Sequence, residues 1–163
     1  MMNSLLLLKL LILLALANGA PVLAKNMLGS RFAFPLDGNL RFFDRKPLLG
    51  SSKTLRGIVA SIGVTSVGAI LLGLEIRVGL LVSGYAMAGD VFSSFVKRRL
   101  SLAPSSKATG LDQIPESLLP LLACRSMLSL SVVSIVILVV IFLILEILLS
   151  KVLYRYHLRD RPY

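Results

Sequence analysis

The chain alternates long apolar segments with shorter stretches rich in Lys and Arg. An apolar segment of about 20 residues can cross a bilayer as a helix, and the pattern predicts five such segments. They lie near residues 4–24, 57–74, 78–96, 113–129 and 131–150. The last two share one apolar run that is too long for a single span, and Pro115 and Pro120 weaken the first of them. We therefore expect an all-α, polytopic membrane protein in which residues 1–163 form one domain.

The first apolar segment has a second interpretation, a signal peptide, because Ala15-Leu16-Ala17 offers a possible cleavage site. The basic residues that normally begin a signal peptide are missing. Cleavage would also export the strongly basic loop at residues 25–56, against the tendency of basic loops to stay in the cytoplasm. We interpret residues 4–24 as an uncleaved first span.

Small residues predict how the spans pack. In the second span they recur at every fourth position, which predicts a groove along one side against which another helix can pack closely. These residues are Gly57, Ser61, Thr65, Ala69 and Gly73. A similar contact is predicted for the third span at Gly84 and Ala88.

Composition agrees with a membrane protein, since 56% of the residues are hydrophobic and none is Trp. The formal net charge of +10 would suit nucleic acid, but no aromatic stacking pattern accompanies the basic residues, so we do not expect nucleic acid as a partner. One Cys and one His exclude an intrachain disulfide and argue against a metal site built on Cys or His.

The basic residues predict the orientation in the membrane. Five spans put residues 25–56, residues 97–112 and the C-terminal tail on the same side. Of the 18 Lys and Arg residues, all but Lys9, Arg77 and Arg125 then lie there, which makes 15. By the positive-inside tendency, that side is the cytoplasm and the N-terminus is outside.

Asp90 is the first candidate functional residue, because it follows a run of small and apolar residues where a carboxylate is unfavourable. On a helix it shares one face with Ser94, Lys97 and Arg98. Lys97 lies two turns away, so another group must compensate Asp90. The alternative is an Asp at a helix end, neutralised by snorkelling basic neighbours.

A second candidate lies before the second span, in Gly50-Ser51-Ser52-Lys53-Thr54. It resembles a phosphate-binding loop but has Ser52 where the pattern needs Gly, and no strand precedes it. Lys53 and Arg56 are still placed to bind anions at a membrane surface, with interfacial anchoring as the alternative.

Asp112 is the third candidate. It either caps the following helix or, with Glu116 on the same helix face, forms a cation site. Asp90 and Asp112 bracket a basic loop, and carboxylates without His or Cys suit Mg²⁺, which binds one or two carboxylates together with substrate phosphates. With Lys and Arg around them, these acids predict phosphoryl or nucleotidyl transfer at a membrane surface.

Four ordered motifs, spread over nearly the whole chain, resemble those of the CDP-archaeol synthase family, integral-membrane CTP transferases related to CDP-diacylglycerol synthases. The motifs are Ala17–Leu23, Pro35–Asp37 leading to Leu49–Gly57, Gly89-Asp90 with Ser94–Arg99, and Leu111–Gln113. The resemblance implies a five-helix enzyme that joins CTP to a lipid phosphate with Mg²⁺ and releases pyrophosphate and a CDP-activated lipid.

The resemblance also implies roles for individual residues. Asp90 and Asp112 would hold the metal and, with Lys53 and Lys97, form the catalytic set. The residues expected to bind substrate or phosphate are Asn18, Lys53, Thr54, Arg56, Ser94, Lys97 and Arg98.

The chain departs from the family at Ser51-Ser52 and Leu55, where the family usually shows Asp-Gly and Trp. The alternative function is therefore a catalytically diverged membrane protein that binds anionic lipid or nucleotide.

Overall fold

The computed structural model describes residues 4–103, 108 and 110–155, and the predicted loop residue Lys107 lies outside them. The described chain is helical. Its helices are α1 (Ser4–Leu28), α2 (Leu55–Leu71), α3 (Ile76–Arg99), α4 (Gln113–Ala123) and α5 (Val132–Arg155). Within those residues the only β-type pairings are two isolated bridges, Pro35 with Thr54 and Arg41 with Pro47. The predicted all-α class is confirmed.

Three helices, α1, α3 and residues 132–150 of α5, are long and apolar enough to cross a membrane, and the apolar α2 is shorter, with 17 residues. The chain is thus a multi-pass integral membrane protein. By contrast, α4 covers only the first part of the predicted fourth span at 113–129. Its 11 residues extend about 16 Å, roughly half of the hydrocarbon core, because the chain leaves the helix after Ala123 and continues in turns.

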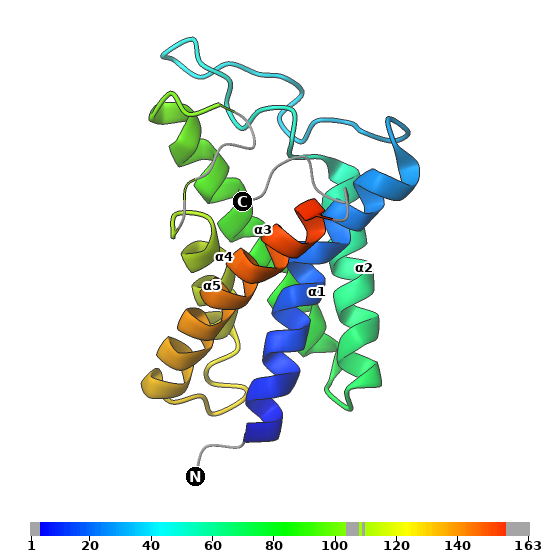
Figure 1. Cartoon of the computed structure of the whole chain (residues 1–163), viewed down its shortest axis with the longest axis vertical. Coiled ribbons are helices and arrows are strands. Elements are labelled where there is room, and N and C mark those ends of the chain that lie inside the picture. Colours follow the sequence, from blue (N-terminus) through cyan, green and yellow to red (C-terminus); the bar gives the residue numbers. More distant parts are fainter. Residues whose placement is uncertain (1–3, 104–107, 109, 156–163) are drawn as a thin grey trace.

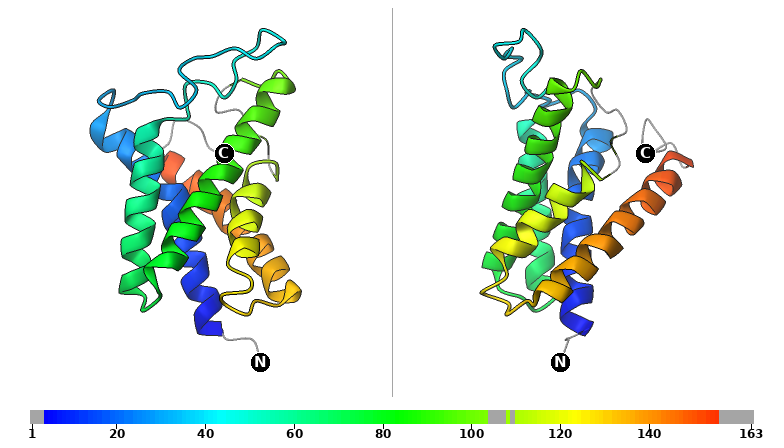
Figure 2. Two further views of the ribbon diagram at one scale, coloured as in Figure 1. Left: turned by 180° about the vertical axis from the view of Figure 1, so that it is seen from behind. Right: turned by 90° about the vertical axis from the view of Figure 1, so that its left-hand side faces the viewer.

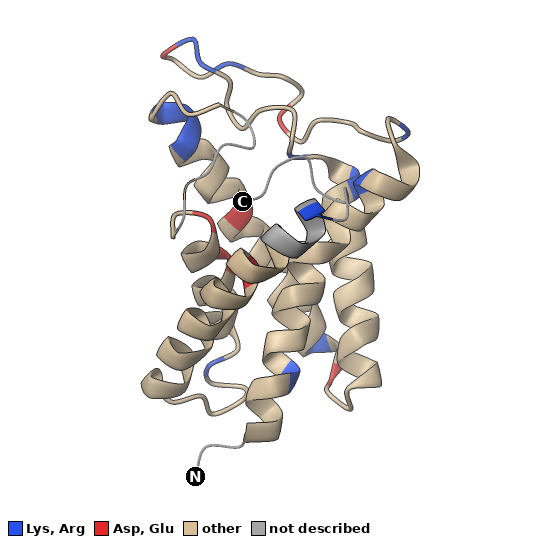
Figure 3. Cartoon of the chain, in the orientation of Figure 1, with Lys and Arg blue, Asp and Glu red and all other residues tan. Residues whose placement is uncertain are grey.

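The bundle has a basic end and an opposite end (Figures 1 and 2). The loop between α1 and α2 lies at the basic end together with the last turn of α3. Figure 3 shows Lys and Arg concentrated at this end. In Figure 1, α4 begins away from the basic end, at about the middle of the length of α3. As a result, the N-terminus of the short helix α4 lies beside the middle of the long helix α3.

Close helix contacts depend on small residues, as predicted for α2. Gly57, Ser61, Thr65 and Ala69 are buried, and Ser61 Oγ donates a hydrogen bond of 2.8 Å to the carbonyl of Ala17 in α1. Gly73 lies beyond the end of α2 with φ +68°, so the predicted groove of small residues ends at Ala69.

The contact predicted at Gly84 and Ala88 is wrong, because both residues lie on the exposed side of α3. Gly79 and Gly89 make the close approaches instead. A Cβ added at Gly79 would lie 2.6 Å from Ser66 Cα, and one at Gly89 would lie 2.5 Å from the carbonyl oxygen of Pro115. Gly89 therefore lets α4 pack directly against α3.

Candidate functional site

The loop after α1 is held by a buried carboxylate. Asp37 is 6% exposed, and its two oxygens accept N–H bonds from Asn39 (3.0 Å), Leu49 (2.8 Å) and Gly50 (3.1 Å). Burial acts to raise the pKa of Asp37, but these donors outweigh it and hold the pKa below its ordinary value of 3.8. The two ends of the loop are thereby tied together just before Lys53.

Lys53 is fixed by its backbone on both sides. Its N–H donates to the carbonyl of Gly50 (3.3 Å), and its own carbonyl accepts the N–H of Leu36 (2.8 Å). Thr54 follows as the N-cap of α2, and its Oγ1 accepts the N–H of Gly57 at 3.2 Å. This local structure sends the Lys53 side chain from the start of α2 toward α3.

The group that compensates Asp90 is Lys53. The Lys53 ammonium forms an ion pair with Asp90 Oδ1, and it is also attracted by Glu116 and Asp112. Burial acts to lower the pKa of Lys53, but the attraction of Asp90 and of the two other acids outweighs it, so the pKa is raised above its ordinary value. One lysine from the first loop therefore interacts with acids of α3 and of the α4 region.

The carboxyl group of Glu116 lies beside that of Asp90, within hydrogen-bonding reach. Glu116 is 7% exposed and lies in the first turn of α4. The absence of a side chain at Gly89 makes this contact possible, because α4 backbone occupies the space that a Cβ would need. Lys53 supplies one positive charge for these two carboxyl groups. They can both stay ionised only if a further cation binds; otherwise they share a proton.

A second ion pair lies next to the first. Lys97 Nζ is 2.7 Å from Asp112 Oδ1, although their angle does not make a hydrogen bond. Lys97 and Arg98 are both buried. Arg98 donates to the carbonyl of Ala103 (3.1 Å) and is attracted by Asp112, while its Nε is buried without a hydrogen-bond partner. We call Lys53, Asp90, Lys97, Asp112 and Glu116 the charged cluster.

With this geometry in view, similarity to known proteins identifies the family. A family model described as CarS-like, CDP-archaeol synthase, matches residues 2–163. The chain belongs to the CDP-archaeol synthase family. The protein named CDP-archaeol synthase from Sulfurisphaera tokodaii is 37% identical over 153 residues, covering 90% of this chain and 89% of the relative. That from Hyperthermus butylicus is 39% identical over 104 residues, covering 60% of this chain and 59% of the relative.

A solved structure described as an intramembrane enzyme for archaeal membrane lipids biosynthesis has the same fold. It superimposes with a TM-score of 0.70 at 26% identity, covering 85% of this chain and 91% of the other. The predicted resemblance is confirmed. As a CDP-archaeol synthase family member, the chain is a CTP-dependent lipid-phosphate cytidylyltransferase.

The predicted site residues separate into two groups. Lys53, Asp90, Lys97 and Asp112 meet in the charged cluster, and Arg98 and Ser94 lie buried on the same part of α3. The other three interact with backbone. Asn18 donates to the carbonyl of Leu14 within α1 (2.9 Å), Thr54 caps α2, and Arg56 donates to the carbonyls of Gly29 and Arg31.

Asp112 stands at the N-cap position of α4, but its side chain makes no capping hydrogen bond and points to Lys97 instead. Glu116 joins the charged cluster, although the sequence predicts for it only a cation site shared with Asp112. Its signal was an acid within an apolar segment, one helical turn after Asp112.

The donor set fits Mg²⁺ as part of a larger complex. Within residues 4–103, 108 and 110–155, no three or more His, Cys, Asp or Glu side chains gather into a site that could hold an ion alone. Asp90 and Glu116 do present neighbouring carboxyl groups, and Lys53 is the one cation that both of them attract among the cluster contacts described above. Mg²⁺ commonly binds through one or two carboxylates plus substrate phosphates, so the substrate would complete the coordination.

A second set of charges lies at the surface of the basic end. Arg99, in the last turn of α3, pairs with Asp44 at 2.7 Å and stacks over the rings of Phe42 and Phe95 at 4.7 and 4.9 Å. Lys46 Nζ donates to the carbonyl of Arg99 at 3.0 Å. We call Phe42, Asp44, Lys46, Phe95 and Arg99 the loop clamp, because it fastens the first basic loop to α3.

Proposed function

We propose that cytidylyl transfer takes place at the charged cluster. The observation that carries this proposal is the meeting of two lysines and three carboxyl groups, drawn from the first loop, α3 and the α4 region, inside an apolar bundle. Buried charges that are incompletely paired are expected at functional sites, since a purely structural role is better served by apolar residues.

The chain's residues would act mainly by holding phosphates. A phosphate oxygen of the lipid attacks the α-phosphorus of CTP; a new P–O bond forms while the bond to the β-phosphate oxygen breaks, and pyrophosphate leaves with those electrons. Lys53, Lys97 and Arg98 would bind the phosphate oxygens as charge builds on them. Ser94, Thr54, Asn18 and Arg56 stay proposed substrate-binding residues.

Asp90 and Asp112 would hold Mg²⁺, and Glu116 joins them as a neighbouring ligand. The ion would neutralise phosphate charge and orient the reacting oxygens. Each aspartate has a lysine partner in the structure, so substrate phosphates would take over those lysines and leave the carboxylates to the cation. The cluster is thus suited to exchange its internal ion pairs for bonds to substrate and metal.

The orientation follows from charge. We propose that residues 1–163 form one domain with the basic end in the cytoplasm, where CTP is available, and the N-terminus outside. The lipid phosphate would come from the bilayer around the bundle. Because relatives are named CDP-archaeol synthases, an ether lipid phosphate is the first substrate to test, with ester lipids beside it.

The test supplies labelled CTP, Mg²⁺ and a panel of ether and ester lipid phosphates to the purified protein in detergent. We expect CDP-lipid from the wild type and a fall of at least about 100-fold in Asp90→Asn, the size typical for loss of an electrostatic stabiliser. Glu75→Gln removes an acid at the opposite end of α3 and serves as the matched control, with unchanged turnover. Absence of product from every lipid would favour the alternative, a diverged protein that binds anionic lipid or nucleotide.

A further inference from the structure

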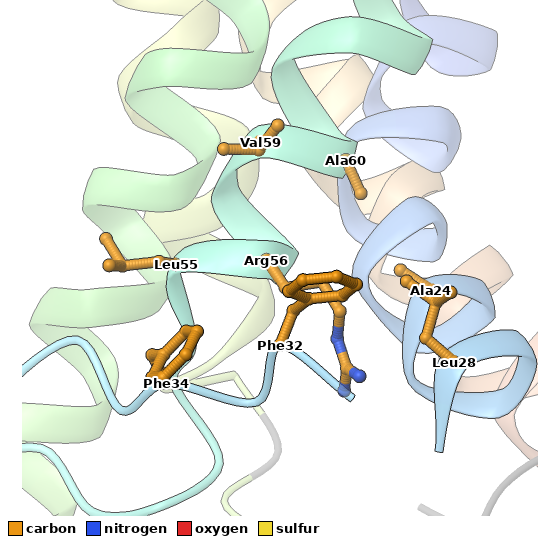
Figure 4. A pocket seen from close by; sticks show the side chains of 8 residues that line it. All are labelled: Ala24, Leu28, Phe32, Phe34, Leu55, Arg56, Val59 and Ala60. Carbon is orange, nitrogen blue, oxygen red and sulfur yellow. The ribbon is translucent and has the colours of Figure 1, made fainter. Parts of the chain in front are cut away.

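A groove with a volume of about 400 Å³ opens between the end of α1 and the start of α2 (Figure 4). Its wall is formed mainly by Leu28 of α1, Phe32 and Phe34 of the loop, and Val59 of α2. Arg56 is the one charged residue among those that line it. The volume falls in the range of small-molecule sites.

The apolar wall is presented outward rather than packed. Phe32, Phe34 and Val59 are 65%, 64% and 69% exposed. Phe32 has φ 56°, a left-handed backbone conformation that is unfavourable for a large side chain and is often kept where a residue is needed in place. These rings lie at the basic end of the bundle, where aromatic side chains of membrane proteins meet lipid head groups.

Arg56 supplies the charge of the groove. Its Nη1 donates to the carbonyls of Gly29 and Arg31, and its Nε is buried without a hydrogen-bond partner. Within the described part of the chain, no carboxylate forms an ion pair with it. The two carbonyls fix the position of the guanidinium while leaving its positive charge unbalanced, which suits an anion.

The groove is separate from the charged cluster but adjacent to it. At the start of α2, Lys53 reaches toward Asp90 of α3, whereas Arg56 turns toward the segment after α1. The two residues are three positions apart, about one helical turn. An anion on Arg56 would therefore be held beside the cluster, on the side that faces away from α3.

We propose that this groove is the docking site of the lipid phosphate substrate, with a hydrocarbon chain against Phe32, Phe34 and Val59 and the phosphate on Arg56. The inference rests on the proposed transferase function. One fixed cation at the edge of an apolar wall is complementary to an amphiphile with an anionic head. A nucleoside triphosphate fits poorly, since its triphosphate carries several negative charges and the residues lining the groove include one cation.

Photolabelling tests the docking site without requiring turnover. A lipid phosphate with a photoreactive group in its chain is added to Asp90→Asn protein in detergent, and the labelled residues are mapped by mass spectrometry. We expect label at the end of α1, in the loop after it and in the first turns of α2. Val59→Phe fills the groove and should lower labelling there about tenfold, equivalent to a loss of about 1.4 kcal/mol in binding.

The matched control is Val67→Phe, the same change on the same helix at a position that is also exposed (56%) but outside the groove. Labelling of the groove should stay as in the parent protein. Equal loss in both variants, or label spread evenly along the lipid-facing sides of the helices, would overturn the proposal.

Head-group recognition is tested with three probes that share one photoreactive chain: a phosphomonoester, a phosphodiester and a neutral alcohol. The phosphomonoester should label the groove best, and Arg56→Gln, which removes the positive charge, should abolish that preference. Equal labelling by all three probes in the parent protein would contradict a substrate site and indicate general lipid contact.

Kinetics separate this inference from the transferase function. In protein with Asp90 intact, Val59→Phe should raise the KM for lipid phosphate about tenfold and leave the KM for CTP unchanged. Groove labelling with no CDP-lipid from any lipid would refute the transfer at the cluster but keep a lipid phosphate site. Turnover with no groove labelling would refute the lipid phosphate site in the groove but keep the transferase function.

Discussion

The charged cluster and the loop clamp both pair basic side chains with Asp, yet their charges are arranged differently. In the clamp, Arg99 meets one acid, Asp44, and two aromatic rings. In the cluster, Asp90 contacts a lysine and a second acid, Glu116. Each charge of the clamp pair thus faces a favourable partner, whereas the cluster contains one contact that is unfavourable unless a proton or cation joins it.

Burial adds to this difference mainly at Lys97. The side chains of Arg99 and Asp44 are 21% and 35% exposed and those of Lys53 and Asp90 are 19% and 22% exposed, whereas Lys97 is only 8% exposed. Partly exposed ion pairs contribute little to stability, and buried ones become strongly destabilising when one partner is lost. We therefore propose that the clamp fixes a loop and that the cluster binds a ligand, and substitutions can test each half.

Lys53→Met should have the largest effect, because it removes the cation shared by three carboxyl groups. We expect loss of measurable turnover and a fall of about 3 kcal/mol in the free energy of unfolding, as for a broken buried ion pair. Turnover and unfolding in detergent are measured together. Arg45→Met removes an exposed cation of the first loop as the control, and near-normal turnover in Lys53→Met would show that the cluster is not the site.

Gly89→Ala should come next, because the new Cβ would meet the backbone of Pro115 and Glu116 at 2.5 to 2.8 Å. The new side chain should push α4 away from α3 and displace Glu116 from Asp90. A displacement of catalytic groups by about 1 Å lowers kcat about 100-fold. Gly84→Ala is the matched control on the same helix, since nothing lies within 4 Å of its Cβ position. Equal kcat in both variants would mean that the contact of Asp90 with Glu116 is not needed.

Much of the fold could be predicted because it depends on local pattern. Apolar length gave the number of helices, and four-residue spacing gave the buried side of α2. The exposure of Gly84 and the burial of Gly89 could not be predicted, because the choice between two small residues on one helix depends on where a neighbouring helix lies. The end of α4 at Ala123 could not be predicted either, since residues 124–129 contain no Gly or Pro that would end a helix, yet they form turns.

The candidate site was predicted as a set of residues but not as a set of contacts. Asp90 and Asp112 stand out because acids are rare in apolar segments. Their partners, Lys53 and Lys97, are 37 and 15 positions away, and nothing local assigns one lysine to each acid. Glu116 was underestimated for the same reason, because its contact with Asp90 depends on the packing of two helices.

Arg99→Gln tests the other half of the comparison and should have a moderate effect. Loss of the ion pair and of two cation–π contacts should lower the free energy of unfolding by about 2 kcal/mol, with kcat changed less than about threefold, since structural contacts of this size leave the chemical step intact. As the control, Arg41→Gln makes the same charge change in the loop that the clamp fastens to α3. A kcat loss as large as that of Gly89→Ala would show that the clamp takes part in catalysis.

Asp37→Asn should have the smallest effect, which depends on pH. The amide keeps one accepting oxygen for the N–H groups of Asn39, Leu49 and Gly50 but loses the charge, so we expect a loss of about 1 kcal/mol at pH 7. Since the native pKa lies below the ordinary value of 3.8, the stabilisation by Asp37 is fully present above that value and is lost as pH falls through the native pKa. Thermal unfolding of the wild type and of Asp37→Asn is measured from pH 7 to about 3. The difference in Tm between them should narrow only at the acidic end. A difference that stays constant over this range would mean that the carboxylate charge does not hold the loop.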